Sequence, residues 1–315
     1  MITGASNSQL IIILVDARNG VTEQTRRHSI IASLLNIPEV VVAVNKMDLV
    51  GYAEDTFENI KREYETVAKR LGLKSVHYFP ISAFVGDNIV NTTEAMPWYK
   101  GTSLLDFLET IEISQNSYKE PRFQVQYVIR PQTEALHDYR GYAGEIISGT
   151  YRKGDAIVVL PEGISTKISK IERNGEEVAE AKAGEPVVMH IEDDIDISRG
   201  DYFASEEAEP TQSQEVEAIV CWMDKRALKE GNKYLLQQRS RLVKVVVKEI
   251  AYKIDVNTLD QEEEVESVKL NEIAKIRIKA AAPLVYDAFT DNPPMGSAIL
   301  IDETSNATVG AVMIA

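Results

Sequence analysis

The sequence predicts an α/β domain with a parallel sheet, followed by two antiparallel β-barrel domains. Two apolar runs near the N-terminus, Leu10–Val15 and Val41–Val44, are typical of strands covered on both faces. Apolar residues at helical spacing separate these runs. From residue 123 onward, short strands alternate with glycine-containing turns, which is the pattern of small barrels. The chain of 315 residues is long enough for two or three such domains.

The first strand is expected at Leu10–Val15 and is closed by Asp16 and a turn at Asn19 and Gly20. We interpret it as a central parallel strand, because both of its faces are apolar. A helix is expected over 24–35, where isoleucine and leucine recur at intervals of three and four.

The second apolar run is followed by a further helix and a third unit. Asp55 and Glu58 have the spacing of a capping box that opens a helix running to about residue 71. A strand near His77 and a helix over 104–111 then complete three strand–helix units.

Two polar stretches divide the rest of the chain. Residues 114–121 end in Pro121 and are interpreted as a linker, and a second linker is expected at 206–214. The first barrel is expected to contain strands at 123–129, 142–148, 156–160, 166–172 and 186–190. The second is expected to contain strands at 215–222, 242–252, 272–278, 298–302 and 307–314. The predicted domains are therefore 1–113, 120–207 and 213–315.

The composition excludes several classes of protein. There are 34 basic and 49 acidic residues, a formal charge of −15, which argues against a surface built to hold nucleic acid. The single cysteine, Cys221, cannot form an internal disulfide, and no Cys/His cluster suggests a metal site. No apolar run is long enough to span a membrane, and the N-terminus does not resemble a signal peptide. We expect a cytoplasmic protein whose partners include neither nucleic acid nor membrane, and we assign no metal ligand.

The stretch Asn45-Lys46-Met47-Asp48 follows the second apolar run directly, at the strand end where open α/β sheets bind ligands. Asp48 can accept two parallel hydrogen bonds from the ring N–H and the exocyclic amine of guanine, a pair that adenine lacks. Asn45 can bond the imidazole edge of the base and tie neighbouring loops together. Lys46 can lay its methylene stem along the purine while its ammonium stays in water. These residue types suit a guanine base.

A second strand end supports the same interpretation. The strand near His77 ends at Ser82-Ala83, where a small residue lets a backbone N–H approach a carbonyl oxygen such as guanine O6. Two strand ends that converge on one base form a more specific pattern than either does alone.

Together, Asn45–Asp48 and Ser82-Ala83 resemble the base-recognition half of a GTPase domain of the translation-factor class. The resemblance implies a partial P-loop GTPase domain followed by two barrels of translation-factor type. It also implies a guanine site made of Asn45, Lys46, Asp48, Ser82 and Ala83, with no catalytic residue assigned.

The parts of such a domain that bind phosphate and magnesium are not found in the sequence. The 315 residues contain no Gly-x-x-x-x-Gly-Lys-Ser/Thr, and no Asp-x-x-Gly precedes the first strand. In the family these motifs lie before the position of residue 1. We therefore expect the amino-terminal strands to be missing, GTP or GDP to bind weakly or not at all, and Mg²⁺ to bind only in the intact protein. We also expect no GTP hydrolysis by this chain and an apolar exposed edge on the Leu10–Val15 strand.

Further stretches resemble the large, GTP-binding subunit of bacterial sulfate adenylyltransferase more closely than any elongation factor. The resemblance covers essentially the whole chain. The stretches are Met96–Tyr99 with Leu104-Leu105, which elongation factors share, and Arg140–Gly144, Asp196–Asp201 and Asn306–Ala311.

This second resemblance implies a heterodimer with a smaller catalytic subunit that transfers the adenylyl group of ATP to sulfate. GTP hydrolysis on the large subunit drives this uphill reaction in the family. Two alternatives remain open: an elongation-factor-like GTPase that binds aminoacyl-tRNA, and a scaffold whose barrels only dock a partner.

Some conspicuous residues are better explained by structure than by function. His28 lies among basic neighbours on a predicted helix and is expected to be a surface or packing residue. The acidic run Glu262–Glu264 is expected to be a solvated loop. Trp98 and Tyr99 are expected to pack in the core, and Arg199 to hold a turn by pairing with an acid.

Overall fold

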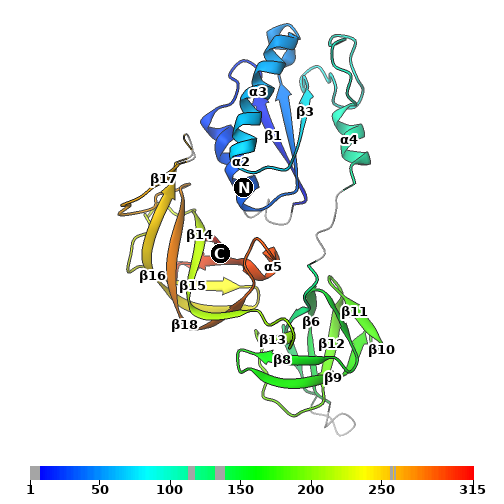
Figure 1. The fold of residues 1–315 in the computed structure, drawn as a ribbon, viewed down its shortest axis with the longest axis vertical. Coiled ribbons are helices and arrows are strands. Elements are labelled where there is room, and N and C mark those ends of the chain that lie inside the picture. The colour runs from blue at the N-terminus through cyan, green and yellow to red at the C-terminus, as the bar shows by residue number, and fades with distance from the viewer. Residues whose placement is uncertain (1–7, 113–117, 132–138, 256–257, 259) are drawn as a thin grey trace. The chain divides into compact units, whose positions relative to one another are not determined.

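The computed structural model describes residues 8–112, 118–131, 139–255, 258 and 260–315 (Figure 1). They form two compact units, one within 1–115 and 255–260 and the other within 116–254 and 261–315. Half of the linker predicted at 114–121, residues 114–117, lies outside the described residues. The first unit is the α/β domain, and the second contains both barrels.

A parallel sheet of three strands forms the centre of the first unit, in the order β1-β2-β3. The strands are β1 (Leu10–Asp16), β2 (Glu39–Asn45) and β3 (Ser75–Pro80). Every residue of β2 from Val40 to Val44 is buried, as expected of a strand covered on both faces. The prediction that Leu10–Val15 is central is wrong, because β1 pairs only with β2 among the described residues.

Helices cover both faces of this sheet (Figure 1). Helix α2 (Glu23–Leu34) packs on β1, and α3 (Glu54–Arg70) packs on β3. On the other face, α4 (Leu104–Thr110) packs against the apolar side chains of β2 and β3. On this second face Leu10 packs against the same cluster, whereas the β1 side chains Ile12 and Leu14 remain open to solvent, 42% and 64% exposed. The expected apolar edge is therefore present.

The helix starts differ from the prediction. Helix α2 begins with a capping box in which Thr22 and Thr25 bond each other's backbone N–H groups. Helix α3 has Ala53 as its N-cap, with no side-chain cap, so the capping box predicted from Asp55 and Glu58 is wrong. Both acids lie inside the helix, and Asp55 stands in its first turn, where a carboxylate interacts favourably with the helix dipole.

The first barrel closes through six antiparallel strands in the order β9-β12-β6-β4-β13-β8, with β8 returning to β9. These are β4 (Arg122–Gln124), β6 (Gly141–Ser148), β8 (Ala156–Leu160), β9 (Ile164–Arg173), β12 (Pro186–Ile191) and β13 (Tyr202–Ser205). Two short strands, β5 (Tyr127–Ile129) and β10 (Glu176–Val178), extend the barrel sheet, and β7 (Thr150–Arg152) and β11 (Glu180–Lys182) form a separate two-stranded sheet. The single strand predicted at 123–129 is therefore two strands.

The second barrel also closes through six strands, in the order β15-β19-β20-β14-β18-β16, with β16 returning to β15. These are β14 (Thr211–Trp222), β15 (Lys233–Gln238), β16 (Arg241–Ile254), β18 (Ile273–Tyr286), β19 (Ser297–Ile301) and β20 (Thr308–Ile314). A two-residue strand, β17 (Gln261–Glu262), extends the sheet, and a short helix, α5 (Pro293–Gly296), precedes β19. Because β14 begins at Thr211, the linker predicted at 206–214 is in part a strand.

The two barrels share a buried seam. The Arg122 guanidinium donates through Nε and Nη2 to the two carboxylate oxygens of Asp287, each at 3.0 Å. Asn292 donates to the same carboxylate at 3.0 Å and to Ser148 Oγ at 3.2 Å. Apolar side chains from both barrels, including Tyr202, pack together beside this network. The seam explains why the barrels form one compact unit.

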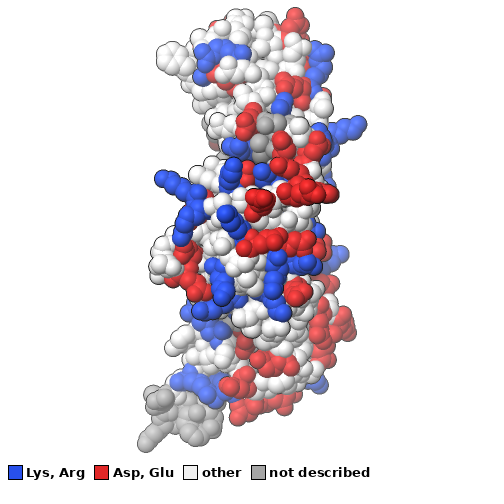
Figure 2. Space-filling view, turned by 90° about the vertical axis from the view of Figure 1, so that its left-hand side faces the viewer, with Lys and Arg blue, Asp and Glu red and all other residues white. Residues whose placement is uncertain are grey.

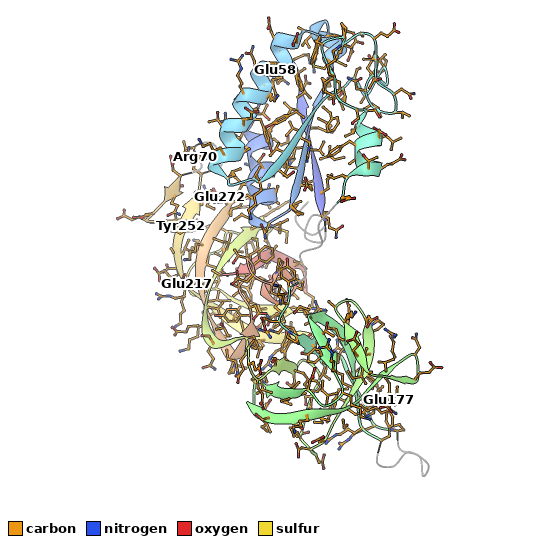
Figure 3. The ribbon with its side chains drawn as sticks, turned by 45° about the vertical axis from the view of Figure 1, so that its right-hand side comes forward. Glu58, Arg70, Glu177, Glu217, Tyr252 and Glu272 are labelled. Atoms are coloured by element: carbon orange, nitrogen blue, oxygen red, sulfur yellow. The ribbon has the colours of Figure 1, made fainter. Side chains whose placement is uncertain are left out.

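Ion pairs cross the outer face of the second barrel. Lys275 pairs with Glu217 at 2.6 Å and Lys253 with Glu272 at 3.2 Å; both acids are labelled in Figure 3. Such exposed pairs each stabilise a fold by only about 0–1 kcal/mol. On the face shown in Figure 2, basic and acidic side chains are interspersed. None of the described helices is both long enough and apolar enough to cross a membrane.

Of the conspicuous side chains, Trp98 packs as expected, and Arg199 does not hold its turn. Trp98 donates from Nε1 to the Tyr52 carbonyl at 2.9 Å and packs on Phe57, which supports the core interpretation. Arg199 is exposed to solvent. The turn it was expected to hold is closed by Asp201, whose carboxylate accepts the Ser198 N–H at 2.7 Å.

Candidate functional site

The ends of β2 and β3 place two loops side by side in the first unit. The strand pairing continues past the strand ends, since Ile81 N–H donates to the Val44 carbonyl at 2.8 Å and Met47 N–H donates to the Ile81 carbonyl at 3.2 Å. Met47 is completely buried and anchors the first loop. Its neighbours Lys46 and Asp48 are therefore held at the carboxyl edge of the sheet, where open α/β sheets bind ligands.

Asn45 joins the two loops. Its Oδ1 accepts the Lys46 N–H at 2.7 Å and the Ala83 N–H at 2.9 Å. The bond lies at a sharp turn of the chain, where Lys46 has a left-handed backbone with φ of 68°. Asn45 thus ties the two loops together, as the sequence predicts. Ala83 N–H, which was expected to approach a ligand carbonyl, donates to Asn45 in the structure, so a ligand oxygen would have to share it.

Asp48 and Ser82 face each other across the loops. Ser82 is completely buried, and its Oγ donates to Asp48 Oδ1 at 2.6 Å. The same Oγ accepts the Val85 N–H at 3.4 Å. The structure therefore brings Asp48 close to the main chain at 82–83, which is the juxtaposition on which the sequence interpretation depends.

Lys46 reaches across to the end of the neighbouring strand. Its ammonium lies 2.8 Å from Oδ2 of Asp16, the last residue of β1. Arg18 binds the same carboxylate through Nε at 3.0 Å and Nη2 at 2.7 Å. The bonds from Arg18 and then Lys46 hold the pKa of Asp16 well below its ordinary value. The carboxylate is therefore charged throughout the neutral range.

Further hydrogen bonds hold the second loop, which follows β3, in place. Tyr52 donates from its hydroxyl to Asp87 at 2.7 Å, and this bond is the main reason that the pKa of Tyr52 rises to about 12. Buried Asn88 donates to the Pro80 carbonyl at 2.9 Å. Because Trp98 also holds the Tyr52 carbonyl, the Met96–Tyr99 stretch supports this edge of the site.

Two residues of the site were missed by the sequence interpretation. Phe84 directly follows Ala83 and is 96% exposed, which is unusual for a phenylalanine in a braced loop. Asp16 ends an apolar run just as Asn45 does, and the two are paired in the sheet register. That position was the available signal for Asp16. Exposure, which the sequence does not give, was needed to single out Phe84.

The groups present suit a flat, polar base. Asp48 offers a carboxylate, Asn45 offers an amide nitrogen, and Lys46 and Phe84 offer apolar surface beside them. Among the residues that the structure describes, no three His, Cys, Asp or Glu side chains are grouped to hold a metal ion. We assign no residue of the described chain to phosphate or magnesium.

Two protein families match the chain. Residues 1–114 match the family described as elongation factor Tu GTP binding domain. Residues 215–315 match the family described as GTP-eEF1A C-terminal domain-like.

Longer relatives match essentially every residue. The chain is 45% identical over 316 aligned positions to the bifunctional enzyme CysN/CysC of Mycobacterium tuberculosis, covering 100% of this chain and 52% of the relative. It is 42% identical to sulfate adenylyltransferase subunit 1 of Buchnera aphidicola, covering 100% of this chain and 66% of the relative. The chain thus spans about half to two thirds of the length of these relatives.

Solved structures show a similar fold. Sup35 complexed with GMPPNP superposes with a TM-score of 0.57 over 99% of this chain and 79% of Sup35. The two sequences are 20% identical, so this likeness concerns the fold alone.

Proposed function

Because the chain belongs to the family of sulfate adenylyltransferase subunit 1, within the elongation-factor-Tu class, we propose that it is the GTP-binding regulatory subunit of such an enzyme. A smaller catalytic subunit converts ATP and sulfate into adenosine 5′-phosphosulfate and pyrophosphate in this proposal. The two subunits form a heterodimer, and GTP hydrolysis in the intact protein drives the reaction.

The convergence of Asp48, Asn45 and the main chain at Ser82-Ala83 carries the proposal. In our account, the Asp48 carboxylate accepts the two donors of guanine while Ser82 holds it in place. Adenine presents an acceptor at the ring position where guanine presents its N–H, so it meets the carboxylate unfavourably. Asn45 keeps its oxygen on the two loops and offers its amide nitrogen to the imidazole edge of the base.

We further propose that the base lies between two apolar surfaces. The Lys46 stem covers one face while its ammonium stays with Asp16. Phe84 covers the other face, which accounts for an aromatic ring left 96% exposed beside the polar groups. Stacking of a base on an aromatic side chain contributes about 1–3 kcal/mol to binding.

That the 315 residues do not hydrolyse GTP by themselves stays a prediction. They contain no Gly-x-x-x-x-Gly-Lys-Ser/Thr loop, and phosphate and magnesium contacts supply most of the catalysis in such enzymes. Release of phosphate from GTP by this chain, abolished by Asp48→Asn, would contradict the prediction.

Sulfate-dependent exchange between pyrophosphate and ATP tests the proposed partnership without requiring hydrolysis of GTP. We expect that adding this chain to the small subunit of a bacterial sulfate adenylyltransferase changes the exchange rate. The change should grow with the amount of complex that the two chains form. Unaltered exchange, together with no complex in sedimentation, would overturn the heterodimer.

The elongation-factor alternative has less support. Relatives named sulfate adenylyltransferase subunit 1 are 42–45% identical to the chain, whereas the likeness to Sup35, at 20% identity, concerns the fold alone. Binding of aminoacyl-tRNA at micromolar concentration or below would favour the alternative. The scaffold alternative predicts no preference of the chain for GDP over ADP.

A further inference from the structure

We propose that Asp16 is a positioning residue of the base site, which holds the Lys46 ammonium so that the Lys46 stem stays over the purine. This inference rests on the proposed function, since it assumes that a guanine base lies against Lys46. Asp16 does not touch the base in this account. It acts only through Lys46.

The sheet register brings the two residues together. Asp16 is paired with Asn45 in the β1–β2 ladder, so Lys46 follows one residue after the strand position that faces Asp16. The Asp16 side chain is 20% exposed and that of Lys46 is 45% exposed. The ion pair at 2.8 Å thus lies half-covered at the edge of the sheet, beside the Asp48 loop.

Lys46 needs such an anchor. Lysine has a flexible four-carbon stem, and fixing it in one conformation costs conformational entropy. A stem that is already held before the ligand arrives loses less freedom on binding. The ion pair also neutralises the ammonium locally, which lets the apolar part of the side chain present itself to the base.

Arg18 fixes the anchor itself. Its guanidinium and its backbone N–H, the latter at 3.0 Å, both bond the Asp16 carboxylate. Arg18 thus bonds both carboxylate oxygens, including Oδ2, which also binds Lys46, and this sets the orientation of the carboxylate. A simple surface ion pair has no such second partner, and its geometry is correspondingly loose.

A double-mutant cycle on GDP affinity tests this role in the 315-residue chain. Asp16→Asn removes the charge and keeps the shape, and Lys46→Met keeps the stem and removes the ammonium. We expect each single variant to weaken GDP binding about threefold, in keeping with a half-exposed ion pair. The double variant is expected to bind like Lys46→Met alone, because Asp16 then has nothing to hold.

Glu23→Gln is the matched control, since it breaks an exposed ion pair with Arg27 at 2.8 Å on helix α2. It should leave GDP affinity unchanged. The effect of Asp16→Asn should also shrink at about 0.5 M NaCl, where exposed charges are screened. A merely structural role would lower stability without this salt dependence.

The outcomes separate the two proposals. If the unaltered chain binds GDP no better than ADP, the proposed function fails. If it prefers GDP but Asp16→Asn binds like the unaltered chain, or if the two losses multiply in the double variant, the base site stands and the positioning role of Asp16 is rejected.

Discussion

Asp48 shows how a single side chain is made selective. Its carboxylate is half-buried and held by the Ser82 hydroxyl, so one oxygen has a fixed partner before any ligand binds. A preorganised charged acceptor is worth more than a mobile one, because less ordering is needed at the moment of binding.

Asp48→Asn should reverse the selectivity. The amide presents a donor where guanine also presents one, so we expect GDP affinity to fall about 10- to 100-fold, the value of one or two hydrogen bonds to a charged group. Xanthosine diphosphate, which carries an acceptor there, should gain affinity. Calorimetric titration with both nucleotides measures the ratio, and an unchanged preference for GDP would remove Asp48 from the base site.

Phe84→Ala tests the stacking surface. We expect GDP affinity to fall about fivefold or more, since base–aromatic stacking contributes about 1–3 kcal/mol. Val85→Ala is the control, because Val85 is 58% exposed in the same loop and has no proposed contact with the base. Equal effects of the two substitutions on nucleotide affinity would show that Phe84 does not stack on the base.

Only some of these residues could be identified from the sequence. Asn45, Lys46 and Asp48 form a compact pattern at the end of an apolar run, and the residue types alone suggest guanine. The partnership of Ser82 with Asp48 spans 34 positions and depends on strand pairing. The bond that occupies Ala83 N–H, and the exposure of Phe84, depend on loop geometry that no local pattern encodes.

Strand β1 shows what an apolar run cannot reveal. Leu10–Val15 is as hydrophobic as β2, so both were interpreted as strands covered on both faces, and Leu10–Val15 as a central one. The structure places β1 at the sheet edge among the described residues, with Ile13 and Val15 buried under α2 and Ile12 and Leu14 exposed on the opposite face. Hydrophobicity measures the tendency to be covered and does not identify what covers the strand.

Leu14→Lys is expected to reduce self-association of the isolated chain. The side chain is 64% exposed on an edge strand, so its replacement should change the free energy of unfolding by less than about 0.5 kcal/mol. Light scattering at rising protein concentration measures the association. Val15→Lys is the control: Val15 is 1% exposed, and the charge should unfold this unit. Comparable destabilisation by both changes would mean that Leu14 is covered in solution.

The start of α3 also differs from what the sequence pattern predicts. Asp55 and Glu58 have the spacing of a capping box with Asp55 as the N-cap, but the N-cap is Ala53, two residues earlier, and the helix begins at Glu54. Capping patterns often match the first turn as well as the cap, since acids are favoured in both places. Thr22 and Thr25 form the actual box on α2, where a threonine replaces the usual Glu or Gln.

Across the whole chain, the order of one α/β domain and two barrels follows from strand length, turn residues and linkers. Each strand predicted for the barrels has an observed counterpart, although 123–129 is two strands, and β13 and β15, which help to close the barrels, were missed along with several short strands. The seam that unites the barrels could not be predicted, because Arg122 and Asp287 are 165 positions apart. The three domain boundaries drawn from the sequence remain a proposal beside the two compact units.

Asp287→Ala should weaken the unit that contains both barrels. The Arg122 side chain is 3% exposed and would lose its carboxylate partner, which costs about 3 kcal/mol or more. Urea unfolding followed by the fluorescence of Trp222, buried in the second barrel, reports the loss. Asp291→Ala, a change at an exposed acid four residues later, is the control. Identical unfolding midpoints for the two variants would show that the seam contributes little.

The most direct test of the base site is the response of single backbone amides to two nucleotides. The ¹⁵N-labelled chain is titrated with GDP and, separately, with ADP. We predict that GDP shifts the amide signals of Lys46 and Ala83, whose N–H groups share Asn45 Oδ1, and that ADP leaves them in place. Equal shifts with both nucleotides, or none with either, would contradict the assignment of this edge to guanine.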